Sequence, residues 1–93
     1  MNAFDAAVIC KALGDPNRLM IIELLTGGEK CTCELLEHFS IRQPTLTHHM
    51  MILSECGLLS SRKDGKKTLY SLNCGTLSEF REFIAGLECV KIS

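Results

Sequence analysis

Two cysteines separated by one residue, Cys31 and Cys33, combine residue type and spacing in a way that suggests chemistry. They begin the segment CTCELLEHF, residues 31–39, which we predict to be a short helix with both thiols in its first turn. Exposed N–H groups and the positive end of the helix dipole favour thiolates at such a position. Thiolates are ligands for soft cations. Taken alone, however, the pair more often represents two small buried apolar residues.

The segment after this pair has the features of a DNA-reading helix. In QPTLTHHMMILSEC, residues 43–56, Pro44 suits a first helical position. Leu46, Met50 and Leu53 recur at the spacing of one apolar stripe. The other side is polar, and we expect it to enter the major groove of double-stranded DNA. The predicted contacts are Arg42, Gln43, Thr45, Thr47 and His48. An ordinary amphipathic helix would explain this segment equally well if it stood alone.

The preceding segments place this helix in a known arrangement. Residues 3–13 and 16–25 are predicted helices, the second capped by Asp15. A three-residue turn, residues 40–42, joins the short helix at 31–39 to the DNA-reading helix. Two helices joined by so short a turn are typical of a helix-turn-helix.

A basic β-hairpin is predicted directly after the helix-turn-helix. Residues 58–63 and 66–72 flank Asp64-Gly65, a strong hairpin signal. Four cations gather near its tip: Arg62, Lys63, Lys66 and Lys67. After a DNA-reading helix, such a hairpin is typical of a wing that contacts phosphates beside the minor groove. A solvated basic hairpin is the alternative.

Charge and composition fit this interpretation. The net charge is only −1, but residues 41–70 carry five basic and two acidic side chains, whereas residues 1–40 carry three and six. A chain of 93 residues predicts one domain, residues 1–93. It has no apolar run long enough to cross a membrane and no basic, cleavable leader, so we expect a cytoplasmic protein without a membrane partner. There, its six cysteines would be free thiols or metal ligands.

The two ends of the chain predict a homodimer. Residues 76–90 form a predicted last helix, whose apolar positions suit packing against another helix. Both terminal helices offer more apolar surface than one small core needs. The expected interface residues are Phe4, Val8, Leu77, Phe80, Ile84 and Leu87. A two-fold dimer would present two DNA-reading helices to a palindromic site. The predicted fold is therefore mainly α, a winged helix-turn-helix of about five helices and a two-stranded wing.

Four segments, taken in order, resemble the ArsR/SmtB family of winged-helix repressors: ALGDPNRLMIIELL, CTCELLEHF, QPTLTHHMMILSECGLL and RKDGKKTLYSL. Cys-Thr-Cys followed by Glu and Leu resembles the Cys-x-Cys-Asp-Leu motif of the arsenical-responsive branch. The resemblance implies a transcriptional repressor that binds operator DNA as a homodimer. It further implies release of that DNA when As(III) or Sb(III) binds Cys31 and Cys33.

Helix geometry suggests how ion binding and DNA release would be coupled. Residues two apart on a helix point to different sides, so we expect the sulfurs to share one ion only if the first turn unwinds or twists. This helix supports the DNA-reading helix, so ligand and DNA would favour different shapes of one element.

The sequence departs from the branch pattern in one respect and leaves alternatives open. Some members have a third cysteine one turn on, where this chain has Leu36 and Glu37. We expect a two-cysteine site, with Cys10 or Cys89 as candidates for a third ligand. The same thiols could instead sense Cd(II), Pb(II) or oxidants. A structural zinc module lacks an evident fourth ligand, and no catalytic constellation suggests an enzyme.

Overall fold

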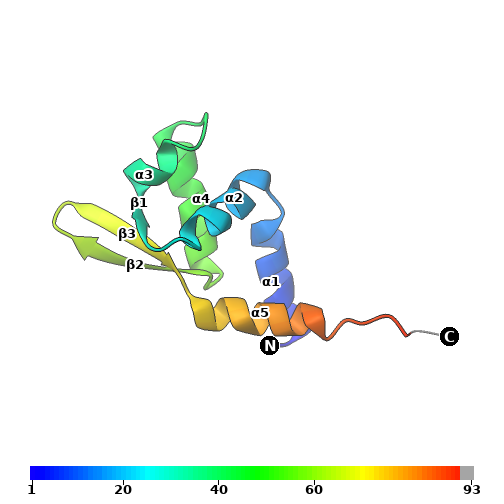
Figure 1. Cartoon of the computed structure of the whole chain (residues 1–93). Coiled ribbons are helices and arrows are strands. Elements are labelled where there is room, and N and C mark those ends of the chain that lie inside the picture. The colour runs from blue at the N-terminus through cyan, green and yellow to red at the C-terminus, as the bar shows by residue number, and fades with distance from the viewer. Residues whose placement is uncertain (91–93) are drawn as a thin grey trace.

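The computed structural model describes residues 1–90 as five helices and a three-stranded antiparallel sheet (Figure 1). The elements in order are α1 (Ala3–Leu13), α2 (Pro16–Leu25), β1 (Lys30–Cys31), α3 (Thr32–Leu36), α4 (Gln43–Glu55), β2 (Leu59–Asp64), β3 (Lys67–Leu72) and α5 (Cys74–Ala85). This is the predicted winged helix-turn-helix, with α3 and α4 as the two helices and β2 and β3 as the wing. The last three residues of the predicted 1–93 domain lie outside the described residues.

Capping side chains fix the first two helices at the predicted bounds. The Asn2 Oδ1 atom accepts a hydrogen bond from the Asp5 amide at 2.9 Å. Asp15 Oδ1 accepts from the amides of Asn17 and Arg18 at 2.8 and 3.2 Å. These bonds satisfy N–H groups that have no partner within the helix, so each helix begins where the sequence provides a cap.

The sheet has one strand more than predicted. Its order is β1-β3-β2, and β1 adds Lys30 and Cys31 to the edge of the hairpin, opposite Tyr70 and Leu69. The hairpin turn also lies one residue further on than predicted, because Asp64 already pairs with Lys67. The two turn residues are thus Gly65 and Lys66. Gly65 has a φ of 63°, which glycine adopts without steric cost.

Two predicted helices have different bounds. The helix predicted at 31–39 spans only Thr32–Leu36, since Cys31 belongs to β1 with extended backbone angles of φ −83° and ψ 164°. The helix predicted at 76–90 begins earlier, at Cys74, because the Asn73 side chain accepts from the Thr76 amide at 3.2 Å. It ends at Ala85. Leu87, predicted to continue its apolar seam, therefore lies beyond the helix.

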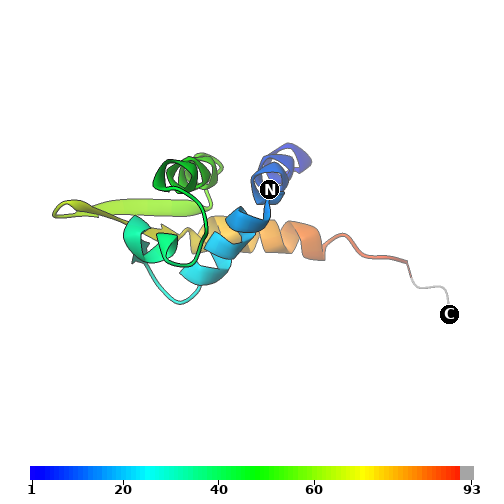
Figure 2. The ribbon, with the colours of Figure 1, turned by 90° about the horizontal axis from the view of Figure 1, so that it is seen from above.

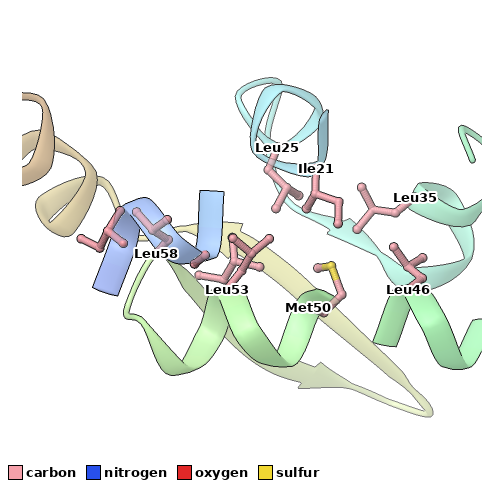
Figure 3. Close-up of a cluster of buried hydrophobic side chains, with 10 residues drawn as sticks. Ile21, Leu25, Leu35, Leu46, Met50, Leu53 and Leu58 are labelled. Atoms are coloured by element: carbon pink, nitrogen blue, oxygen red, sulfur yellow. The ribbon is translucent and has the colours of Figure 1, made fainter. Parts of the chain in front are cut away.

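The core forms around α4. Leu46, Met50 and Leu53 are almost fully buried and point toward Ile21 of α2 and Leu35 of α3 (Figure 3). In Figures 1 and 2 the hairpin projects at one end, whereas α1 and the end of α5 lie toward the other. The core cluster also contains Leu59 of β2, so it fixes α4 relative to the wing. Within residues 1–90, no helix has the length and apolar character needed to cross a membrane.

Candidate DNA interface and thiol site

The outward face of α4 carries the predicted DNA contacts. Thr45, Thr47 and His48 are exposed on the helix, and Arg42 and Gln43 are exposed at its N-terminal end. All five positions are thus accessible to a ligand as large as DNA. They offer amide, hydroxyl, imidazole and guanidinium groups, which bond base edges and phosphates.

His49 lies on the other side of α4 and makes a contact that was not predicted from the sequence. Its side chain is buried, and its Nδ1 lies 3.1 Å from Nη1 of Arg18. Since a guanidinium can only donate, Nδ1 accepts this hydrogen bond. Arg18 Nε also donates to the carbonyl oxygen of Ala12. Arg18 therefore ties α4 to the end of α1, and so helps to orient α4.

The four wing cations differ in their surroundings. Lys66 and Lys67 are exposed at the tip and have no ion-pair partner within residues 1–90. Lys63 Nζ donates to Thr68 Oγ1 at 2.9 Å. Arg62 is already paired, with its Nε 3.0 Å from Glu29 Oε2 and its Nη2 bonded to Oε1. The two lysines at the tip are hence the cations most available to phosphate.

The Glu29–Arg62 pair is electrostatically coupled despite its exposure. The hydrogen bond from Arg62, helped by its positive charge, holds the pKa of Glu29 below its ordinary value of 4.5. Glu29 in turn raises the pKa of Arg62. Exposed pairs of this kind contribute little to stability. The pair does, however, join the residue before β1 to the middle of β2.

Cys31 and Cys33 meet where β1 joins α3. Their Sγ atoms form a disulfide across a Cα–Cα distance of 5.4 Å. Cys31 is buried and Cys33 is exposed. The expectation that a helical turn must unwind is wrong, because Cys31 precedes the helix in extended conformation. Glu34 supports this conformation, since its Oε1 accepts the Cys31 amide at 3.1 Å.

The other cysteines do not join this pair within one chain. Four cysteines are free: Cys10, Cys56, Cys74 and Cys89. Cys10 lies on α1, and Cys89 follows α5. Across residues 1–90 there is no group of three or more His, Cys, Asp or Glu side chains that could hold a metal ion. Neither Cys10 nor Cys89 is thus brought to the pair as a third ligand from the same chain.

Backbone pairing connects the thiol pair to the wing. Leu69 of β3 pairs with Cys31 on one side and with Arg62 on the other. On its other side, the pair adjoins α3, whose Leu35 packs against α4 in the core. Cys31 is consequently connected to the wing through β3 and to α4 through α3.

The predicted dimer residues divide into two groups. Phe4, Val8, Ile84 and Leu87 are exposed, with exposed fractions of 86%, 58%, 44% and 68%. Leu77 and Phe80 are half-buried and pack on the chain's own core instead. The first group is therefore exposed apolar surface, carried by α1, by the C-terminal part of α5 and by Leu87 just beyond it.

Comparison with known proteins agrees with this architecture. A family described as "Bacterial regulatory protein, arsR family" matches residues 15–61. An arsenical resistance operon repressor of Staphylococcus xylosus is 46% identical over 84 residues, 90% of this chain and 77% of that protein. A cadmium resistance transcriptional regulatory protein CadC homolog of Staphylococcus aureus is 36% identical over 73 residues, 77% of this chain and 60% of that protein. Among solved structures, a possible transcriptional regulator for arsenical resistance superposes with a TM-score of 0.79 at 29% identity, covering 86% of this chain and 83% of that one.

Proposed function

The chain belongs to the ArsR family of bacterial regulatory proteins, and from this premise we propose that it leaves its operator when As(III) or Sb(III) binds Cys31 and Cys33. As a member of this family it is a DNA-binding transcriptional repressor and not an enzyme. The observation that carries the proposal is the convergence of two cysteine sulfurs at the junction of β1 and α3.

The donor set fits a soft, thiophilic ion. In the reduced protein the two thiols share one location, and the exposed Cys33 provides access from solvent. Two thiolates match the preference of soft centres for sulfur. An external thiol, or Cys10 or Cys89 of the partner subunit, completes the coordination if a third sulfur is needed.

Release of DNA follows from the connections of this site. In the reduced protein no bond joins the sulfurs, so an ion held by both sets the distance between them and shifts Cys31, which is paired to the wing through β3 and adjoins α3. Ion and DNA then favour different arrangements of one element. A typical coupling free energy of about 1–3 kcal/mol would weaken operator binding by roughly 5- to 150-fold.

The DNA-bound form is proposed to be a homodimer built from single domains spanning residues 1–93. Each α4 enters a major groove through Arg42, Gln43 and its exposed Thr and His side chains, while Lys66 and Lys67 of the wing contact phosphate. The exposed apolar residues of α1 and the end of α5 supply the interface, which gives the two-fold symmetry that a palindromic operator requires.

The test is operator binding by the reduced protein with and without arsenite. Wild type should lose affinity with arsenite, whereas Cys31→Ser/Cys33→Ser should bind DNA normally and ignore arsenite. Cys74→Ser, which removes another exposed cysteine, should respond like wild type. Operator affinity that is unchanged by saturating arsenite would overturn the proposal.

A second candidate is supported by the disulfide itself. In this version hydrogen peroxide takes two electrons and two protons from the Cys31 and Cys33 thiols, forming the disulfide and two waters. Cd(II) or Pb(II) are further soft ions for the same thiols. Titrating the reduced repressor–operator complex separately with arsenite, Cd(II), Pb(II) and peroxide separates these signals by the concentration at which each releases DNA.

A further inference from the structure

Met51 lies on the exposed side of α4, although its sequence neighbour Met50 is in the core. Its side chain is 49% exposed, whereas that of Met50 is 1% exposed. Residues three and four apart lie on the same face of a helix. Met51 therefore shares the exposed face of His48 and Thr47, one turn further along.

The remaining composition of α4 limits how that face can read DNA. Gln43–Glu55 contains no Lys or Arg, so the commonest specific contact, a bidentate bond from Arg or Lys to guanine, is absent from the helix itself. Gln43 can bond adenine. The groove also exposes one apolar group, the 5-methyl of thymine, which apolar side-chain atoms recognise by contact. On this face those atoms belong to Met51 and to the methyl groups of Thr45 and Thr47.

We propose that Met51 is a specificity determinant that recognises a thymine 5-methyl group in the major groove. This inference rests on the proposed placement of α4 in the groove. Met51 follows Gln43 by a distance of roughly 12 Å along the helix, given about 1.5 Å per residue. One turn later Glu55 is exposed, and its negative charge disfavours closer approach to phosphates. Met51 thus lies at the last outward position before the repulsive end of α4, and its flexible thioether adapts to a methyl group.

The experiment removes the methyl group from the DNA and the thioether from the protein. The probe is a duplex that wild type selects from a random library. Each thymine is replaced in turn by deoxyuridine, which pairs identically but lacks the methyl. Wild type should lose about fourfold in affinity when deoxyuridine replaces thymine at one position in each half-site. This factor corresponds to about 0.8 kcal/mol for burying one carbon. Met51→Ala should bind the thymine and deoxyuridine duplexes equally at that position.

The matched control is Met20→Ala, which removes an exposed methionine from α2 and should retain the fourfold discrimination. An equal loss on deoxyuridine in Met51→Ala and wild type, or no loss at any thymine, would overturn this inference and leave the proposed repressor intact. Failure of wild type to select any duplex would instead overturn the repressor proposal, and this inference with it.

Discussion

At the scale of single residues, the backbone of Cys31 decides whether two cysteines can meet. The sequence suggests a helical Cys-x-Cys, in which the side chains diverge. The residue is instead extended, and the Glu34 carboxylate bonds its amide. One residue placed before the helix rather than in it removes the need for unwinding. The extended backbone thereby brings the two sulfurs together where β1 joins α3.

Met50 and Met51 give a matched test of which side of α4 faces the core. Met50→Ala should lower the free energy of unfolding by about 2–5 kcal/mol, because it leaves a cavity beside the α2 residues. Met51→Ala should change it by no more than about 0.5 kcal/mol, since the side chain is half exposed. Urea denaturation measures both. Equal losses for the two variants would mean that the assigned faces of α4 are wrong.

The apolar stripe of α4 could be predicted from the sequence. The polar contacts that orient this helix could be predicted only in part. Leu46, Met50 and Leu53 recur at helical spacing and are buried as expected. The bond between Arg18 and His49 was not predictable, because the two residues are far apart in sequence and neither belongs to a periodic pattern. Local spacing reveals a face, but it does not reveal the partner on that face.

Acid titration tests the Glu29–Arg62 pair. The pKa of Glu29 is lowered in the folded protein by the Arg62 hydrogen bond, so its contribution to stability is present above the ordinary value of 4.5 and is lost as the pH falls through the lower folded value. In Arg62→Ala, Glu29 should titrate near 4.5. NMR of the side-chain carboxyl carbon measures this change. An unchanged titration would show that the pair does not persist in solution.

At the scale of elements, the wing combines a predicted hairpin with an unpredicted strand. The Asp64-Gly65 pair between two short segments predicted β2 and β3. β1 has only two residues, Lys30 and Cys31, which is too short for any periodic signal. It forms because β3 provides an unpaired edge next to the chain. This pairing, which no local pattern encodes, attaches the thiol pair to the wing.

Lys66→Ala tests the wing as a phosphate contact. The side chain is exposed in the hairpin turn, so removing it should weaken binding similarly on all DNA sequences. The slope of log affinity against log salt concentration should fall in magnitude by about one. Lys11→Ala on α1, another exposed lysine, provides the control and should leave the slope unchanged. The same slope in Lys66→Ala as in wild type would exclude this residue from the interface.

At the scale of the whole molecule, the exposed apolar surface of α1 and the end of α5 should hold two copies together. Phe4 is 86% exposed, and an aromatic side chain that becomes buried in an interface contributes strongly to association. Phe4→Glu introduces a charge there, so sedimentation should show a monomer where wild type is a dimer. Each monomer then binds its half-site independently, so the affinity for a palindromic duplex should fall on the order of 100-fold.

Binding to a duplex with a single half-site distinguishes loss of the dimer from loss of the fold. Phe4→Glu should keep its affinity for a duplex with one half-site, because α4 and the wing are held by a core that does not contain Phe4. Leu19→Glu, at an exposed apolar position on α2, should remain a dimer with full palindrome affinity. A Phe4→Glu protein that sediments as wild type does would place the interface elsewhere. The spacing of the two α4 helices would then have to come from another surface.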